Sequence, residues 1–118
     1  MISPEGKWNE AGCNVISNDK LINILQEYVN LGLTLYIGTD SMLYSDYCIF
    51  SCIIAIHNND MNIAKYYFQK QKFKEEKFKV LESKIFKEVE MSISIANFLK
   101  SKIPNAKIEV HVDIGDKE

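Results

Sequence analysis

The chain has 118 residues and a formal net charge of −2 at pH 7, a length that fits one domain. Hydrophobic residues make up 47% and charged residues 25%, which is typical of a globular protein with its own core. No apolar run reaches the roughly 18 residues of a membrane span, and residues 1–9 lack the apolar stretch of a signal peptide. We therefore expect one cytoplasmic domain over residues 1–118 that makes no use of a membrane.

The three cysteines, Cys13, Cys48 and Cys52, are too few and too scattered for a disulfide framework. Their odd number fits free thiols in a reducing compartment. Cys48 and Cys52 lie in an apolar run, so we expect them to pack in the core.

The first predicted element is a helix over residues 19–30. Residues 1–18 are rich in Gly, Asn and Ser and are expected to be irregular. Ser17, Asn18 and Asp19 offer helix N-caps. Apolar residues at helical spacing follow them (Leu21, Ile24, Leu25, Tyr28 and Val29). Gly32 then ends the helix.

Three strands are predicted next, over residues 33–39, 47–57 and 62–74. The first, LTLYIGT, is rich in aliphatic and β-branched residues and is expected to be buried on both faces. A short polar link, 41–46, and a turn cluster, 58–60, separate the strands. These short connections predict an antiparallel meander.

A long helix and a fourth strand complete the predicted elements. Over residues 80–101 the apolar period changes to that of a helix, with one face formed by Leu81, Ile85, Val89, Ser92, Ala96 and Leu99. Pro104 ends this helix, and residues 107–114 alternate strictly, as in a strand. The right-handed crossover rule places this strand beside the first and parallel to it. The sequence therefore predicts an α/β fold with a mixed sheet.

Two aspartates come at the ends of the strands that are predicted to be parallel neighbours. Asp40 follows the first strand and Asp113 lies near the end of the fourth, so both carboxylates are expected at one edge of the sheet. Two close carboxylates repel each other, and a divalent cation removes that conflict. Mg²⁺ and Mn²⁺ favour such oxygen ligands.

Glu88 is the third candidate ligand. It lies at the margin of the apolar face of the long helix, where a carboxylate is costly unless it is paired or bound to a metal. Glu90 projects from the other side of the helix and is expected to be solvated. Glu82 is a weaker candidate, because the helix dipole alone favours an acid in the first turn.

Two further residues are expected close to this cluster. His111 shares a strand face with Asp113, from where it would support a metal ligand through a hydrogen bond. An ordinary surface histidine fits the same pattern. Ser41, the neighbour of Asp40, is expected in the same supporting role.

Lysines are concentrated between Lys65 and Lys87. This stretch contains eight lysines and three glutamates, which gives it a local net charge of +5. Such a strip is able to follow the phosphates of RNA, DNA or a hybrid, and its candidate contacts are Lys70, Lys72, Lys74 and Lys77. A solvated strand edge and helix start would have the same composition. The chain contains no arginine among its fourteen basic residues, which excludes bidentate guanidinium recognition of phosphate.

Three segments resemble a known family. They are IGTDS at 37–41, KIFKE at 84–88 and HVDIG at 111–115, and together they resemble the YkuK-type bacterial proteins, which are classed as ribonuclease H-like. The resemblance covers roughly residues 20–115. It implies the ribonuclease H-like mixed sheet, with Asp40, Glu88 and Asp113 as catalytic residues that hold two Mg²⁺ or Mn²⁺ ions during phosphodiester hydrolysis.

The resemblance also leaves two functions open. The chain ends soon after the fourth strand, so the C-terminal part of the family's fold is expected to be absent. A second copy or a partner chain would then cover the incomplete sheet. The first hypothesis is a metal-dependent nuclease. The alternative is a nucleic-acid- or protein-binding module that keeps the fold without the chemistry.

Overall fold

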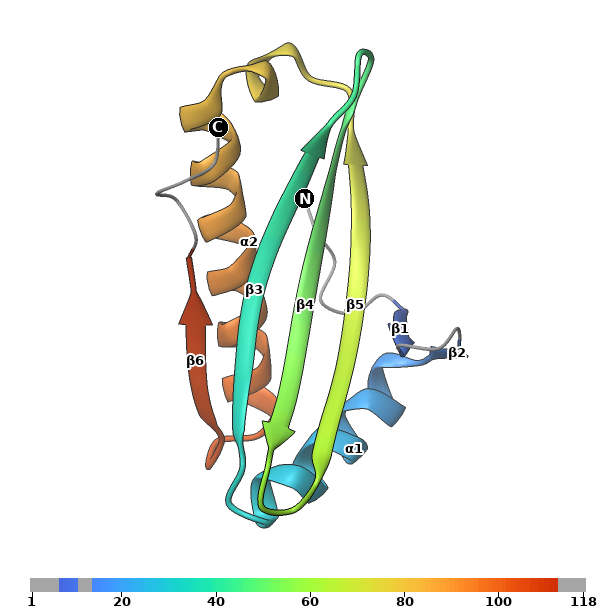
Figure 1. Ribbon diagram of the computed structural model, residues 1–118, viewed down its shortest axis with the longest axis vertical. Coiled ribbons are helices and arrows are strands. Elements are labelled where there is room, and N and C mark those ends of the chain that lie inside the picture. The colour runs from blue at the N-terminus through green and yellow to red at the C-terminus, as the bar shows by residue number, and fades with distance from the viewer. Residues whose placement is uncertain (1–6, 11–13, 113–118) are drawn as a thin grey trace.

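The computed structural model describes residues 7–10 and 14–112, and these form a six-stranded mixed sheet and two α-helices. The sheet has the strand order β2-β1-β5-β4-β3-β6 (Figure 1). Its strands are β1 (Trp8–Glu10), β2 (Asn14–Ile16), β3 (Thr34–Leu43), β4 (Cys48–Asn58), β5 (Ile63–Phe73) and β6 (Lys107–His111). The helices are α1 (Asn18–Asn30) and α2 (Leu81–Lys102), and a 3₁₀ turn, η1 (Glu76–Lys79), precedes α2.

The predicted meander and crossover are both present. β3 pairs with β4, and β4 with β5, in antiparallel fashion. The chain then returns through α2, and β6 pairs with β3 in parallel, from Thr34 opposite Lys107 to Gly38 opposite His111. The α/β fold class and the ribonuclease H-like sheet order predicted from the sequence are therefore confirmed.

The first predicted helix also has the expected ends. Ser17 is its N-cap, with a side chain that accepts a hydrogen bond from the Lys20 amide at 3.2 Å. Gly32 follows the helix with φ at +87°, a conformation that favours glycine.

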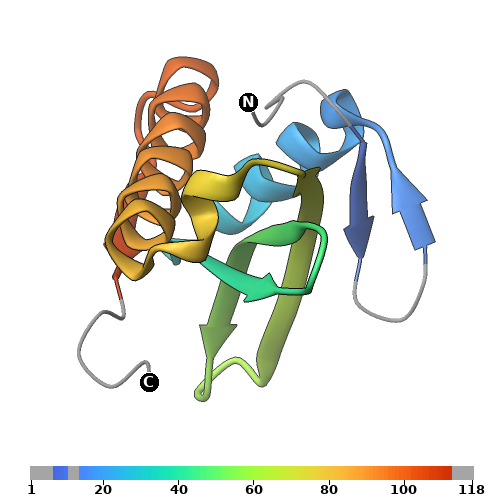
Figure 2. The ribbon, with the colours of Figure 1, turned by 90° about the horizontal axis from the view of Figure 1, so that it is seen from above.

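Both helices cover the same face of the sheet (Figure 2). Along β3 and β4, alternate residues point to that covered face and form the core, among them Leu35, Ile37, Phe50 and Ile54. The residues between them point away from the helices and are partly or fully exposed. The expectation that the first strand is buried on both faces was therefore wrong, because within the described residues both helices lie on one side.

Residues 1–18 are not irregular throughout, in contrast to the prediction. β1 and β2 form a small antiparallel hairpin, and β1 extends the sheet by pairing Asn9 with Phe68 and Glu10 with Tyr67. Trp8 is completely buried in the core and anchors the hairpin. The hairpin was not predicted, because a strand of three residues is too short to show the alternation of apolar and polar residues that indicates a strand.

Candidate functional site

The second half of β3 extends beyond its parallel neighbour. β3 pairs with β4 as far as Leu43, whereas its pairing with β6 ends at Gly38. The strand is also longer than the predicted 33–39, because the ladder with β4 continues to a tight turn. Asp40 thus lies within the strand rather than after it. Beside residues 39–43, on the β6 side, the described part of the chain has no strand.

Alternation along β3 sends neighbouring side chains to opposite faces of the sheet. Thr39 and Ser41 point to α2, where the Thr39 hydroxyl lies 2.7 Å from the hydroxyl of Ser92. Asp40 is exposed and points to the face that carries no helix. There it borders a hollow of about 280 Å³, lined also by Ser41, Met42, Tyr44, Ile49, Ser51, Ile53 and Lys70.

Glu88 lies in α2 and faces β3, as its position on the helix predicted. Only 4% of the residue is exposed, and its carboxylate accepts a hydrogen bond from the Ser41 hydroxyl. One helical turn later, Ser92 contacts Thr39. Glu88 and Ser92, one turn apart on the helix, thus contact Ser41 and Thr39, which lie on the same face of the strand. These paired contacts fix the rotation of α2 against the sheet and direct Glu88 towards Ser41.

The Asp40 carboxylate bends towards the side of β3 that faces away from β4. Its Oδ1 atom accepts a hydrogen bond from the Ser41 amide at 2.9 Å. In the hairpin of β3 and β4 the Tyr44 amide donates to the Tyr47 carbonyl at 2.8 Å. Because hydrogen-bonded and non-hydrogen-bonded pairs alternate in an antiparallel ladder, Ser41 and Phe50 form a non-hydrogen-bonded pair. The Ser41 amide therefore points away from β4, to the side where β6 has ended.

Ser41 consequently contacts both carboxylates, Asp40 through its amide and Glu88 through its hydroxyl. The two acids approach it from opposite faces of the sheet. Adjacent Cα atoms are about 3.8 Å apart, so Glu88 reaches the strand one residue away from Asp40. Two carboxylates at the end of a strand are a donor set that suits Mg²⁺ or Mn²⁺.

The third predicted ligand, Asp113, lies outside the described residues. Within residues 7–10 and 14–112, no three His, Cys, Asp or Glu side chains are grouped closely enough to hold a metal ion. The described residues therefore supply at most two carboxylate ligands at this end of β3, Asp40 and Glu88.

The covered face also holds two buried thiols. Cys52 lies 3.1 Å from the Thr39 hydroxyl, and burial raises the pKa of Cys52 to about 11, although this hydrogen bond opposes the shift. Burial also raises the pKa of Cys48, with Lys84 opposing and Glu88 adding to the shift. Both cysteines are free thiols in the core, as predicted. No local pattern predicted that Thr39, Cys52 and Ser92 would meet, because they come from three separate elements.

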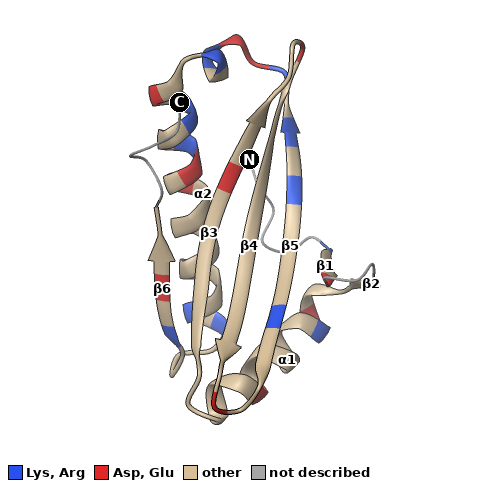
Figure 3. Cartoon of the chain, in the orientation of Figure 1, with Lys and Arg blue, Asp and Glu red and all other residues tan. Residues whose placement is uncertain are grey.

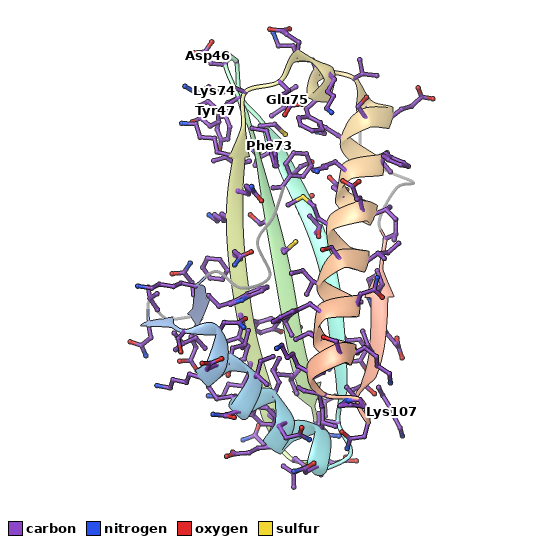
Figure 4. All side chains as sticks on the ribbon, turned by 180° about the vertical axis from the view of Figure 1, so that it is seen from behind. Asp46, Tyr47, Phe73, Lys74, Glu75 and Lys107 are labelled. Carbon is purple, nitrogen blue, oxygen red and sulfur yellow. The ribbon has the colours of Figure 1, made fainter. Side chains whose placement is uncertain are left out.

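The predicted lysines fall into two groups. Lys70 and Lys72 alternate with buried residues on β5, so they point to the uncovered face. Figure 3 shows that β5 carries lysines along its length. Lys74 follows the end of β5 and lies near the tip of the sheet, as does Tyr47 (Figure 4). Lys77 belongs to η1, where it pairs with Glu75 at 3.2 Å and borders a different hollow beside Phe78 and α2.

His111, at the end of β6, is an exposed residue on the uncovered face. Its ring lies 3.3 Å from the Glu109 carboxylate and meets the Tyr36 ring edge-on at 5.4 Å. Asp113, which it was expected to support, is not described. No helix within the described residues is long and apolar enough to cross a membrane.

The order of elements and the acids define a class of protein. An antiparallel meander, a crossover helix that carries a buried glutamate, and a last strand parallel to the aspartate-bearing strand are the features of the ribonuclease H-like fold. The chain belongs to the Ribonuclease H-like family, whose model matches residues 17–118. The resemblance to the YkuK-type proteins is thereby confirmed. Neither curated proteins nor solved structures give a match to the chain.

Proposed function

We propose that this protein is a metal-dependent nuclease that hydrolyses phosphodiester bonds in RNA, DNA or a hybrid of the two. Asp40, Glu88 and Asp113 would hold two Mg²⁺ or Mn²⁺ ions. The single observation that carries the proposal is the double contact of Ser41, whose amide binds Asp40 and whose hydroxyl binds Glu88. Membership of the Ribonuclease H-like family supports it.

The burial of Glu88 supports a cation at this site. A carboxylate that is 4% exposed is costly in free energy unless it is paired, hydrogen-bonded or bound to metal, and the hydrogen bond from Ser41 meets part of that cost. Carboxylate oxygens are ligands that a hard cation favours, and Ser41 holds those of Asp40 and Glu88 at neighbouring positions of β3.

Asp113 enters the proposal through the sequence. It follows β6, the strand that pairs in parallel with β3, and the resemblance to the YkuK-type proteins implies that it is the third ligand.

The residues of the proposed site would have separate roles in the reaction. Ions bound by the carboxylates would supply an activated water and neutralise the leaving oxygen. Ser41 would hold Glu88 in its orientation, since its hydroxyl contacts that carboxylate. Lys70, across the hollow from Asp40, would attract the phosphate group of the substrate.

Calorimetry with Mn²⁺ and cleavage of labelled RNA, DNA and hybrid oligonucleotides test the proposal. Asp40→Asn and Glu88→Gln keep the shape of each side chain and remove its charge. We expect each to reduce Mn²⁺ affinity and cleavage at least about 100-fold. Glu90→Gln is the matched control, because Glu90 lies on the same helix but is exposed, and it should leave both unchanged.

Two results would contradict the nuclease. One is the absence of Mn²⁺ binding by the wild type. The other is cleavage that persists in both Asp40→Asn and Glu88→Gln. Metal-independent nucleic-acid binding without cleavage would favour the binding module that the sequence left open.

A further inference from the structure

The uncovered face of the sheet, here called the open face, carries an unusual set of side chains. Because both helices cover the other side, this face is formed by alternate residues of four strands. They include Tyr36, Asp40, Met42, Ile49, Ser51, Ile53, His57, Tyr66, Phe68, Lys70, Lys72 and His111. Aromatic rings, lysines and two acids, Asp40 and Glu109, are thus brought together from segments far apart in the sequence.

Three rings form a cluster at one end of the open face. Tyr36 of β3 stacks on His57 of β4, with 4.7 Å between ring centroids and 13° between planes. The same tyrosine meets His111 of β6 edge-on at 5.4 Å. Both histidines of the chain therefore flank one tyrosine. Nearby on β5, Tyr66 is 46% exposed, so flat aromatic surface is available to a ligand.

Cations gather at the other end of the open face. Lys70 lies over the Phe68 ring at 5.8 Å, and Lys72 lies over the Tyr47 ring at 4.3 Å. Lys70 is in register with Ser51, and Ser51 with Asp40, so one row across three strands joins a lysine to the candidate catalytic acid. Tyr36 precedes Asp40 by four residues, which corresponds to about 13 Å along a strand.

This combination fits a single-stranded nucleic acid better than a second copy of the chain. Exposed rings accept unpaired bases by stacking, and lysines accept phosphates. A duplex hides the faces of its bases and cannot use the rings in this way. A second copy would have to bury Lys70 and Lys72, which are costly to remove from water without acidic partners.

We propose that a single-stranded segment of RNA or DNA lies along the open face. Its bases stack on the cluster of Tyr36, His57 and His111, its phosphates follow Lys70 and Lys72, and it passes the hollow beside Asp40. The inference deepens the proposed nuclease, since it names the substrate as single-stranded and gives its path to the catalytic acid.

Fluorescence anisotropy with labelled 15-nucleotide oligo(dT) and oligo(U), and with a duplex of the same length, tests this path. The titrations are run in EDTA, so that binding is measured apart from cleavage. We expect both single strands to bind more tightly than the duplex, and binding to weaken as salt increases. Tyr36→Ile, which keeps a strand-forming side chain but removes the ring, should weaken binding about tenfold. Lys70→Gln should weaken binding and reduce its salt dependence.

Matched controls lie on the covered side of the molecule. Phe86→Ala removes a ring that is 73% exposed on α2, and Lys20→Gln removes an exposed lysine of α1, so both should bind like the wild type. His57→Val is a second ring variant, and circular dichroism verifies that each variant is folded. Equal binding by wild type, Tyr36→Ile and His57→Val would overturn the proposal, as would preference for the duplex.

Two further outcomes separate this inference from the proposed nuclease. If the strand binds in EDTA and to Asp40→Asn but is never cut, the open-face site stands and the nuclease fails. If metal-dependent cleavage persists while Tyr36→Ile and Lys70→Gln bind normally, the nuclease stands and the path fails. Light scattering that shows a dimer, dissociated by Tyr36→Ile, would overturn the open-face site in favour of a second copy.

Discussion

The two faces of the sheet differ in how their polar groups are used. On the covered face, Thr39 and Ser41 each contact a polar side chain of α2 beside a largely apolar core. On the open face the polar groups and rings are accessible, and several come from β5. The contrast indicates that the covered face supplies stability and the open face is free to bind. β3 contributes to both, because Ser41 joins Glu88 on one side to Asp40 on the other.

Adjacent isoleucines on β4 measure this difference directly and give the largest expected effect. Ile54 is completely buried on the covered face, whereas Ile53 on the open face is 36% exposed. Ile54→Ala should lower the free energy of unfolding by about 3 kcal/mol, because it leaves a cavity in the core. Ile53→Ala should lower it by about 1 kcal/mol. Urea denaturation measures both, and equal losses would mean that the open face is also part of a packed interior.

The sequence predicted the order of the helices and strands more successfully than the face on which each side chain lies. The long helix, the meander and β6 have regular apolar patterns, so their existence and type could be predicted. The hairpin of β1 and β2 was missed because each strand has three residues. Glu88 was correctly directed to the sheet by its helical position. Asp40 was expected at the same edge of the sheet as Asp113, and the alternation of Leu35, Ile37 and Thr39 places it on the face opposite the helices.

The contacts between β3 and α2 could not be predicted, because a partner 53 residues away is a property of packing and not of local pattern. Ser41 was expected near the site through its neighbour, Asp40, and its contact with Glu88 agrees with that position. Whether Asp113 completes the site remains a prediction.

The contact of Thr39 with Ser92 gives the second prediction. Ser92→Ala should reduce the free energy of unfolding by about 1–2 kcal/mol, since the half-buried Thr39 hydroxyl loses a partner. The double variant Ser92→Ala/Thr39→Val should lose less free energy of unfolding than the sum of the two single variants, by about 0.5 kcal/mol or more. Ser101→Ala on the exposed side of the same helix should change stability by less than about 0.5 kcal/mol. Additive losses would show that the two hydroxyls are not coupled.

The buried thiol of Cys52 makes the covered face sensitive to alkaline pH. Its pKa rises from an ordinary 9.0 to about 11 because burial disfavours the thiolate. The folded state therefore holds the proton more tightly than the unfolded state. This stabilisation is complete below pH 9.0 and is lost as the pH rises towards 11. Between about pH 8 and pH 10, the wild type should lose about 1 kcal/mol more than Cys52→Ala. Parallel pH profiles of the urea midpoint would rule out this contribution.

The smallest expected effect concerns Glu90, two residues from Glu88 but exposed to solvent. A hydrogen bond from Lys87, at 2.8 Å, and the charge of that lysine lower the pKa of Glu90. The resulting stabilisation is present above the unfolded pKa and is lost as the pH falls through the folded pKa. Glu90→Gln should cost less than about 0.5 kcal/mol at neutral pH, because exposed helical ion pairs are weak.

The loss in Glu90→Gln should also shrink in salt, which urea denaturation at two ionic strengths would measure. A loss above about 1 kcal/mol that is independent of salt would place Glu90 in a buried network. The contrast between Glu88, held for chemistry, and Glu90, left in water, would then fail. The two would no longer differ in burial, and the assignment of Glu88 depends on that difference.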